Sequence, residues 1–513
     1  MPVKTFGSAV YGVEAQTITV EVNIFSGKPA YFIVGLPDNA VKESMLRIES
    51  ALSTNGLRMP RQKIVVNMAP ADIRKEGSAY DLTIATGILA QTEQIPTDEI
   101  ESYVIMGELS LDGQVQPIKG ALPIAIQARA EKIKGFILPQ QNAREAAIVS
   151  DIEVYGISHI SELVDFFKNQ KKPDRTVVDT RKEFFSSVNN YDADFADVRG
   201  QENIKRSLEI AAAGGHNAIL IGPPGAGKTM LAKRLPTILP PLNLHEALET
   251  TKIHSVAGKL SAADALVTVR PFRAPHHTVS DVALVGGGGN PQPGEISLAH
   301  NGVLFLDELP EFKRTVLEVM RQPLEERRVT IARAKMSVDY PSSFMLVAAM
   351  NPCPCGYYNH PEKECVCPPG IVQKYLSKVS GPLLDRIDLH VEVTPVNFDE
   401  LASTRKSENS ALIRERVVKA RLIQESRFKD FDYINCNAQM SSQMVRETCL
   451  IDDTGQQLLK TAMDKLGLSA RAYDRILKVA RTIADLDASE HIGTEHLAEA
   501  INFRSLDREK WAG

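Results

Sequence analysis

A glycine-rich stretch in the middle of the chain has the residue types and spacing of a phosphate-binding loop. It fits the pattern G-x-x-x-x-G-K-[ST] and lies between the apolar run NAILIG and the helical stretch KTMLAKRLPTIL, which is the context that such a loop requires. Glycines let the backbone wrap an anion with several N–H groups pointing inward, and the helix N-terminus adds its positive dipole end. The residues expected to hold a nucleotide are Gly222, Pro223, Pro224, Gly225, Ala226, Gly227, Lys228, Thr229 and Met230.

Two acidic residues, Asp307 and Glu308, end the apolar run VLFL and complete the set that ATP hydrolysis needs. Lys228 would reach the β and γ phosphates of ATP. Thr229 and Asp307 would hold Mg²⁺ through oxygen atoms. Glu308 would orient and deprotonate the attacking water, a task for a carboxylate that lies close to the γ phosphate but does not bind the metal. These residues predict a Mg²⁺-dependent ATP hydrolase.

Four of the six cysteines crowd into residues 353–367. Two C-x-C arms, Cys353 with Cys355 and Cys365 with Cys367, offer four soft ligands, enough for a closed tetrahedral Zn²⁺ site with a structural role. The C-x-C spacing is less diagnostic than C-x-x-C, and the alternative is a set of buried or redox-idle thiols. His360 lies between the arms and could replace one cysteine.

The composition fits a large soluble protein with several domains. The chain has 513 residues, of which 43% are hydrophobic and 24% charged, and this length exceeds what one core usually supports. The N-terminus lacks a charged segment followed by an apolar run, and no apolar stretch is long enough to span a bilayer, so we expect a cytoplasmic protein without membrane contact. The net charge of −5 means that any DNA binding must come from local basic patches.

Hydrophobic periodicity divides the chain into four segments. Residues 1–168 alternate short β-like runs with helical stretches and predict a mixed α/β domain. The polar segment 169–194 breaks this pattern and is predicted to be a linker. Residues 195–397 again alternate strands with helices, which predicts a mainly parallel sheet, and residues 398–513 predict a helical lid. The expected fold class is therefore α/β.

The loop and the acidic strand end resemble those of the AAA+ ATPases, and three further residues extend the resemblance. The strand SFMLVAAMN ends in Asn351, where this family places a polar residue that senses the γ phosphate. GPLLDRIDL carries Arg386 at the position of an arginine finger that acts on the neighbouring subunit. LSARAYDRIL carries Arg471, which matches the lid arginine that contacts the γ phosphate. A planar, permanently charged guanidinium suits both places because it stabilises the charge that spreads during phosphoryl transfer.

Two stretches narrow the resemblance to the Mg-chelatase-like branch of the AAA+ proteins. Residues 270–300 look like an insertion in the second core helix, and residues 328–341 look like the hairpin before the sensor strand. Related motors point this hairpin into a central channel, so its charge predicts DNA contacts, although a charged hairpin is more often simply solvated. The expected DNA-binding residues are Arg333 and Lys335 on the hairpin and Phe272 and Arg273 in the insertion.

The first domain resembles the proteolytic domain of Lon through the stretches KEGSAYDLTIA and MGELSLDGQVQPIKGALPIA. Lon-type proteolysis uses a Ser-Lys dyad, but Ala79 stands at the position of the nucleophile and Leu122 at that of the base. We therefore expect a peptidase-inactive scaffold, because a dyad needs a hydroxyl and an amine within hydrogen-bond reach. Over essentially the whole chain, the order of motifs resembles the ComM/YifB family of Mg-chelatase-like ATPases.

That resemblance implies a hexameric, ATP-driven DNA helicase that promotes branch migration while incoming single strands recombine during natural transformation. The expected cofactors are ATP, Mg²⁺ and a structural Zn²⁺, and the expected partners are DNA and further copies of the chain. A metal-chelatase-type motor subunit, which would remodel a protein partner, stays open as an alternative, although such subunits lack the Lon-like domain. An ATP-dependent protease is a third function, against which Ala79 speaks.

Overall fold

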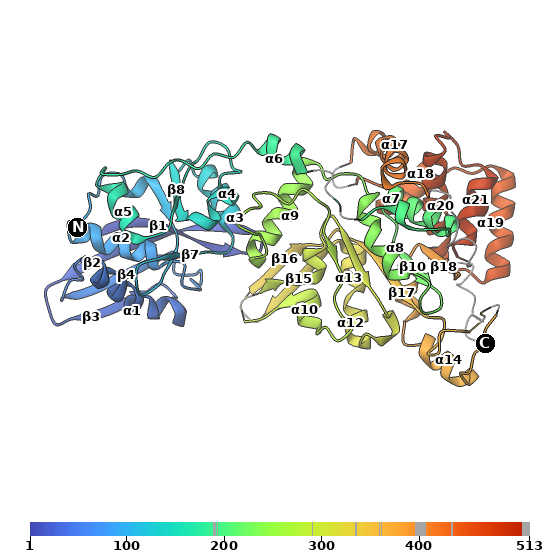
Figure 1. Ribbon diagram of the computed structural model, residues 1–513, viewed down its shortest axis with the longest axis horizontal. Coiled ribbons are helices and arrows are strands. Elements are labelled where there is room, and N and C mark those ends of the chain that lie inside the picture. The colour runs from blue at the N-terminus through green and yellow to red at the C-terminus, as the bar shows by residue number, and fades with distance from the viewer. Residues whose placement is uncertain are drawn as a thin grey trace.

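The computed structural model is elongated, with an α/β body at the N-terminal end, a second α/β body in the middle and a helical body at the other end (Figure 1). No helix formed by the described residues is long and apolar enough to cross a membrane. The structure describes residues 1–187, 191, 193–289, 291–333, 336–358, 360, 362–395, 407–431 and 434–504.

The N-terminal body is built on a seven-stranded sheet with the strand order β3-β4-β2-β1-β5-β8-β9. β1 pairs with β2, and β2 with β4, in antiparallel register, and the other neighbours are parallel. Because successive side chains of a strand point to opposite faces, β2 buries Ile18, Val20 and Val22 on one face. The strands are β1 (Val3–Tyr11), β2 (Glu14–Phe25), β3 (Ala30–Val34), β4 (Lys63–Ala69), β5 (Tyr103–Ile105), β8 (Gly135–Pro139) and β9 (Glu153–Ile157).

Helices cover the buried face of this sheet. α2 (Asp81–Gln91) packs on β1 and β2 and is buried along nearly its whole length, and α3 (Ala121–Ala130) packs on β2. The remaining elements of this body are α1 (Asn39–Thr54), α4 (Gln140–Ala146), α5 (Ile160–Phe167) and the short hairpin of β6 (Glu108–Leu109) and β7 (Val115–Gln116). Within the segment predicted as a linker, α6 (Thr180–Ser187) buries Phe184 against the N-terminal body. The domain boundaries themselves stay predictions.

The central body contains five strands in the order β11-β14-β17-β10-β18, and all neighbours are parallel. Every residue of β10, β14 and β17 is buried, so these strands are apolar without alternation, as expected for a parallel sheet covered on both faces. This confirms the predicted α/β class. The strands are β10 (Ala218–Ile221), β11 (Phe272–Arg273), β14 (Val303–Leu306), β17 (Met345–Met350) and β18 (Leu389–Glu392).

The helices and insertions of the central body surround this sheet (Figure 1). The helices are α7 (Glu202–Gly214), α8 (Lys228–Arg234), α9 (Leu244–Ala257), α12 (Arg314–Val319), α13 (Arg321–Glu326), α14 (Pro369–Leu376) and α15 (Gly381–Leu384). After α9, the insertion forms α10 (Asp281–Val285), β12 (Gly286–Gly287), β13 (Gln292–Pro293) and α11 (Glu295–Leu298). A separate antiparallel hairpin consists of β15 (Arg328–Arg333) and β16 (Met336–Pro341).

The C-terminal body is helical, which agrees with the predicted lid. Its longest helices, α17 and α20, both pack against α7 of the central body. Its helices are α17 (Ser410–Phe428), α18 (Ser442–Thr448), α19 (Asp453–Leu466), α20 (Ala470–Leu486) and α21 (Thr494–Asn502).

The N-terminal and central bodies meet through α3, α4 and α9. The Glu145 carboxylate accepts hydrogen bonds from the Ser255 hydroxyl of α9 and, at 2.9 Å, from the backbone N–H of Leu122. Burial raises the pKa of Glu145, and these hydrogen bonds oppose the shift. The Gly120 N–H also donates to the Ser255 carbonyl at 3.1 Å. The N-terminal body is therefore attached to the helix that leads into the insertion.

Candidate functional site

The phosphate loop runs between β10 and α8. Gly225 and Gly227 adopt φ values of 79° and 82°, a left-handed conformation that strains any residue with a side chain. Gly222 lies so close to the end of β18 that a Cβ atom there would sit 2.2 Å from the Val393 carbonyl oxygen. The loop's own backbone therefore requires Gly225 and Gly227, and the close approach of Val393 requires Gly222.

Lys228 folds back into this loop. Its ammonium donates hydrogen bonds to the carbonyl oxygens of Gly222 and Pro223, at 2.7 and 2.9 Å, and to Asn351 Oδ1 at 3.0 Å. Burial lowers the pKa of the ammonium, and the Asp307 carboxylate opposes that shift. Because Asn351 follows β17, which lies next to β10, the fold joins two residues predicted for the phosphate site from distant parts of the sequence.

Thr229 and Asp307 meet at the same edge of the sheet. Thr229 Oγ1 donates to Asp307 Oδ2 at 2.6 Å, and Asp307 Oδ1 accepts from the backbone N–H of Glu308 at 2.9 Å. A hydroxyl and a carboxylate oxygen are hard ligands of the kind that Mg²⁺ takes beside water and phosphate. The pair therefore fits Mg²⁺, which when bound would neutralise charge on the phosphates.

Glu308 stands on strained backbone and has a partner that the sequence analysis did not assign to it. Its φ of 52° lies in the left-handed region, which costs a residue with a side chain about 1–3 kcal/mol. His277 Nδ1 lies 3.2 Å from Glu308 Oε2, and the His277 ring packs edge-on against Phe312. His277 follows β11 in the insertion, so this contact links the insertion to the residue predicted to activate water.

Arg386 lies at the opposite edge of the core sheet from the phosphate loop. It shortly precedes β18, and its backbone carbonyl accepts a hydrogen bond from Asn217, which precedes β10. β10 has four residues, so about 13 Å of strand separates the two edges. The Arg386 guanidinium forms an ion pair with Glu325.

Arg471 lies in the first turn of α20, and its contact with a γ phosphate stays a prediction. One turn further along α20, Arg475 forms an ion pair with Asp388, immediately before β18. Burial lowers the pKa of Arg386 and Glu325 opposes this, while the positive charge of Arg471 adds to the lowering. The lid thus packs against the amino edge of the sheet, where Arg386 also lies.

The two candidate DNA contacts of the insertion are engaged within the protein. Phe272 belongs to β11 of the core sheet, and its ring stacks on Phe305 with 5.9 Å between ring centroids. Arg273 donates two hydrogen bonds to the Glu295 carboxylate, at 2.6 and 2.7 Å. Both side chains thus have partners within the protein, and their contact with DNA stays a prediction.

The hairpin of β15 and β16 forms at the predicted place and runs in register from Arg328 opposite Pro341 to Arg333 opposite Met336. Lys335 and the side chain of Arg333 lie outside the described residues. Beside the tip, the Tyr11 hydroxyl donates a hydrogen bond to the Ser337 carbonyl at 3.0 Å. The N-terminal body therefore touches the hairpin as well as α9.

The side chains of Cys353, Cys355, Cys365 and Cys367 come together in one cluster. Cys353 Sγ lies 3.3 Å from Cys355 Sγ and 3.6 Å from Cys365 Sγ, and all four sulfurs lie within 4.8 Å of one another. Tetrahedral zinc with Zn–S bonds of about 2.3 Å places its sulfurs about 3.8 Å apart, so the donor set fits this metal. The His360 ring nitrogen Nδ1 instead accepts hydrogen bonds from two backbone N–H groups of the following turn.

The cysteine cluster packs against the phosphate loop. Gly356 lies so close to Pro224 that a Cβ atom at position 356 would sit 2.4 Å from Pro224 Cδ. Burial opposes ionisation of Cys355, but hydrogen bonds from Tyr357 N–H and neighbouring groups outweigh it and lower the pKa of this thiol to about 6. A thiolate is the form that binds metal. Metal bound here would hold the loop that supports the nucleotide cradle.

At the positions of the Lon dyad, the structure has Ala79 and a fully buried Leu122. The Ser78 hydroxyl, one position before Ala79, is hydrogen-bonded to the Glu108 carboxylate. Neither dyad position supplies the hydroxyl or the amine that peptide cleavage by this chemistry needs.

Three family models match successive parts of the chain. "Magnesium chelatase, subunit ChlI" matches residues 194–401, "Subunit ChlI of Mg-chelatase" matches residues 20–142, and "Magnesium chelatase, subunit ChlI C-terminal" matches residues 407–504. The similarity therefore extends over all three bodies and includes the phosphate loop, Arg386 and Arg471.

Individual relatives match along nearly the full length. The chain is 44% identical to competence protein ComM of Haemophilus influenzae over 507 residues, which covers 98% of this chain and 97% of the relative. It is 42% identical to the protein YifB of Salmonella typhimurium, covering 98% of this chain and 96% of the relative. A shorter match, at 33% identity over 178 residues, covers 31% of this chain and 32% of Lon protease 2 of Bacillus subtilis.

Replacing Cys353 by serine should remove about one equivalent of zinc per chain, because the site loses one of four thiolates. It should also lower the melting temperature, since metal binding adds to folding free energy. Elemental analysis of protein purified without chelator measures the first effect, and a thermal melt the second. Cys436→Ser is the matched control, because Cys436 is a buried thiol outside the cluster. Wild-type protein without any bound zinc would contradict the assignment.

Proposed function

Since this chain belongs to the ComM/YifB family of Mg-chelatase-like AAA+ ATPases, we propose that it is an ATP-driven, hexameric DNA motor that promotes branch migration. Family membership rests on 44% identity over 98% of the chain and on the matched family models. The family implies ATP hydrolysis with Mg²⁺. The proposal adds the DNA substrate and the ring, and places the motor in recombination of incoming strands during natural transformation, a setting that the name of the competence relative supports.

The separation of the phosphate loop from Arg386 is the observation that supports the ring. The loop lies at the carboxyl edge of the core sheet, while Arg386 and the lid helix α20 lie at the amino edge. A nucleotide in one copy would therefore receive Arg386 from another copy. Such an interface is head-to-tail, and a head-to-tail interface closes into a ring when its rotation allows.

Hydrolysis divides among the residues of two copies. Lys228 leaves its carbonyl partners to bind the β and γ phosphates, and Thr229 and Asp307 hold Mg²⁺. Glu308 accepts a proton from the attacking water as the water's oxygen bonds to the γ phosphorus and the bond from that phosphorus to the β–γ bridging oxygen breaks, which releases ADP and phosphate. Arg386 of the neighbouring copy stabilises the charge that develops on the phosphoryl oxygens. None of these steps needs a residue of the N-terminal body.

The contact between His277 and Glu308 connects this chemistry to the proposed DNA channel. In the conformation described here, the imidazole holds one oxygen of the carboxylate that must reach the water. Movement of the insertion on DNA binding would release Glu308. DNA would then increase the population of the state in which Glu308 is free of His277, because a ligand shifts a two-state equilibrium toward the state that it binds better.

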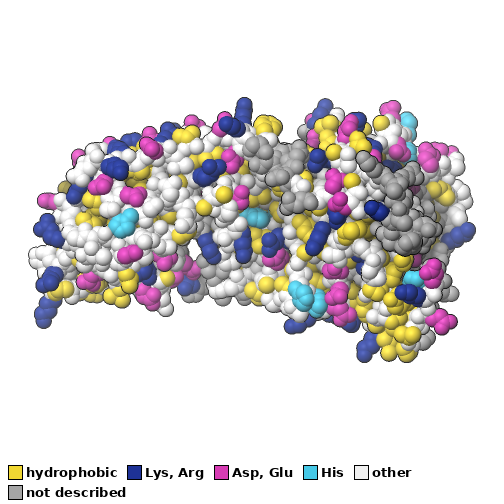
Figure 2. Space-filling model, in the orientation of Figure 1, with side chains coloured by type: hydrophobic (Ala, Val, Ile, Leu, Met, Phe, Trp, Pro, Cys, Tyr) yellow, Lys and Arg dark blue, Asp and Glu magenta, His cyan; other side chains and the backbone are white. Residues whose placement is uncertain are grey.

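The proposed DNA-binding surface is a small basic patch and not a broad positively charged face. On the face shown in Figure 2, Lys and Arg side chains alternate with Asp and Glu, and no broad basic area is visible. The hairpin is therefore the proposed site of DNA contact, through Arg333 and Lys335, and the N-terminal body is placed to support it through Tyr11. The alternative, a motor subunit that remodels a protein partner as a metal chelatase does, would need no such hairpin charge.

Glu308→Gln should bind ATP with unchanged affinity, because the cradle around Lys228 stays intact. Its ATP turnover should fall by about 100-fold or more, because an amide cannot accept the proton of the attacking water. Rapid-quench hydrolysis and nucleotide binding, measured on the same preparation, check both halves. Lys228→Ala is the contrasting variant and should lose binding itself. Normal hydrolysis by Glu308→Gln would show that the roles are misassigned.

DNA should stimulate ATP turnover, and branched DNA should do so more than linear duplex. The stimulation should decline steeply between about 50 and 200 mM salt, since phosphate contacts release counterions. Steady-state ATPase assays across a salt series measure this. If no DNA of any form changes the rate, the chelatase-type alternative is favoured instead.

His277→Ala should raise ATP turnover in the absence of DNA and reduce the further increase caused by DNA, because Glu308 is then released without the effector. The control is His276→Ala, whose ring stacks on His277 at 4.1 Å between centroids without an ion-pair contact to Glu308. A His277→Ala variant that keeps both the low basal rate and the full DNA response would remove His277 from the coupling.

A further inference from the structure

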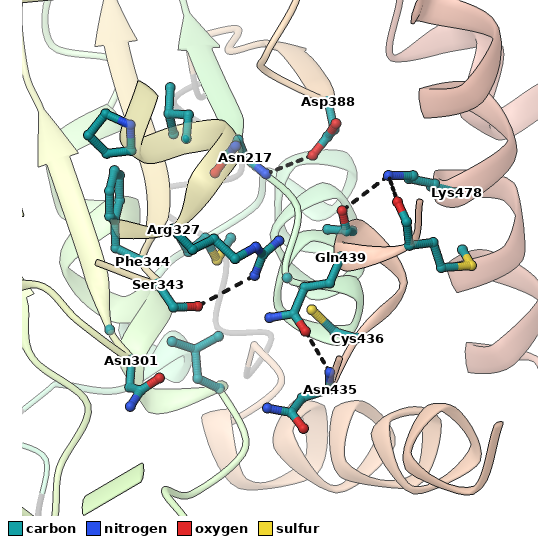
Figure 3. A pocket seen from close by; sticks show the side chains of 18 of the residues that line it. Asn217, Asn301, Arg327, Ser343, Phe344, Asp388, Asn435, Cys436, Gln439 and Lys478 are labelled. Atoms are coloured by element: carbon teal, nitrogen blue, oxygen red, sulfur yellow. Dashed lines mark hydrogen bonds between the residues drawn. The ribbon is translucent and has the colours of Figure 1, made fainter. Parts of the chain in front are cut away.

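A cavity of about 300 Å³ lies between the amino edge of the core sheet and the lid (Figure 3). Asn217, Asn301 and Ser343, which shortly precede β10, β14 and β17, line its sheet side. Gln439 and Lys478 line its lid side. The cavity therefore lies at the other end of β10 from the phosphate loop and is separate from the nucleotide cradle of the same chain.

The cavity carries an excess of positive charge. Its three carboxylates each already pair with an arginine. Arg421 and Lys478 donate to backbone carbonyls and have no carboxylate partner within the described residues, and Arg327 has none either. The cations are Arg270, Arg327, Arg386, Arg421, Arg475 and Lys478, and the carboxylates are Glu246, Glu325 and Asp388.

Arg327 also has few hydrogen-bond partners within the described residues. Its φ of 56° is a strained value for a residue with a side chain. In the described part of the chain its guanidinium donates a single hydrogen bond, 3.4 Å long, to Ser343 Oγ, although it has five N–H donors. Burial lowers the pKa of Arg327, and the nearby Cys436 and Asp388 oppose the shift only in part. Figure 3 shows the Arg327 side chain pointing toward Gln439 and Cys436.

Arg386 and Arg475 present further unused donors. The Nε atom of each is buried, and no described residue accepts a hydrogen bond from it. Arg386 is only 6% exposed, so bulk water does not reach this nitrogen. Burying polar groups and charges without partners is costly, and an anion in the cavity would supply the missing acceptors.

We propose that the cavity is a phosphate-binding site in which Arg327 and Arg475 contact the anion together with Arg386. The tetrahedral oxygens of a phosphate match the forked donors of guanidinium groups. Its charge offsets the excess of cations over carboxylates. Arg327 and Arg475 are then phosphate ligands in addition to Arg386, which the family resemblance identifies as the arginine finger.

The phosphate has two sources, the nucleotide of a neighbouring copy or a free anion. Only the first source, the nucleotide of a neighbouring copy, rests on the proposed function. The position of Arg386 at the edge that would face a neighbour favours this source. If the phosphate belongs to a neighbour, a second copy can restore the ATP turnover of a variant, and a mixing experiment tests this.

Arg327→Ala in the full-length chain should lower ATP turnover by about 100-fold, as the loss of one oxyanion donor does. Arg327→Lys should retain part of the rate, because it keeps the charge but loses the fork. Lys419→Ala is the control: Lys419 is 70% exposed, pairs with Glu415 on the lid surface and does not line the cavity. It should hydrolyse ATP as the wild type does.

Mixing Arg327→Ala with Lys228→Ala should restore turnover if the phosphate belongs to a neighbour. The Lys228→Ala copy binds no ATP but offers an intact cavity to the nucleotide of the Arg327→Ala copy. In parallel, inorganic phosphate is titrated calorimetrically into Lys228→Ala and into the double variant. The double variant carries both Lys228→Ala and Arg327→Ala. If it loses phosphate binding and mixing does not restore ATP turnover, the result supports the phosphate site in the cavity and identifies a free anion as its ligand.

Two results would overturn the proposal. The first is an Arg327→Ala variant as active as Lys419→Ala with unchanged phosphate binding. The second is an inactive variant that mixing does not restore and whose phosphate binding equals that of its parent, because Arg327 would then be only structural. A wild-type protein that does not hydrolyse ATP would refute the proposed function alone, since the phosphate titration still tests the cavity.

Discussion

Five parallel strands share one direction, so their carboxyl ends meet at one edge of the core sheet and their amino ends at the other. At the carboxyl edge, the phosphate loop after β10, the acidic pair after β14 and Asn351 after β17 come within hydrogen-bond distance of one another. At the amino edge lie Arg386 and the lid. Parallel pairing therefore separates the predicted nucleotide cradle from the predicted arginine finger, and the proposed ring rests on this separation.

Buried polar contacts fix the lid to the amino edge. The ring of His216, two residues after α7, lies 2.8 Å from the Thr482 hydroxyl of the lid and 3.4 Å from the Asp388 carboxylate. Burial opposes ionisation of Asp388, but Arg475 and His216 hold its pKa well below its usual range. Because a buried charge that loses its partner is expensive, the lid and β18 are expected to move as a unit. Any change of lid angle then also moves Arg386, two residues before Asp388, and the walls of the cationic cavity.

The sequence predicted the buried strands of the core sheet and the short motifs of the candidate site. The apolar runs of β10, β14 and β17 have no polar alternation because both faces of the sheet are covered. The phosphate loop, Asp307 with Glu308, and the C-x-C arms are short patterns whose chemistry depends on neighbouring residues in the chain. The fold brings the residues of these patterns together, and the Thr229 to Asp307 hydrogen bond joins the two residues predicted to hold Mg²⁺.

The remaining features depend on which distant residues pack together. The amino-acid sequence determined the nucleotide cradle, the sulfur cluster and the helical character of the lid, because these follow from local spacing and periodicity. Only the tertiary structure decided that His277 reaches Glu308, that Phe272 stacks on Phe305 and that the lid packs against the amino edge of the core sheet. It also created the cavity around Arg327, since the excess of charge there arises from side chains of the core and the lid that no local pattern connects.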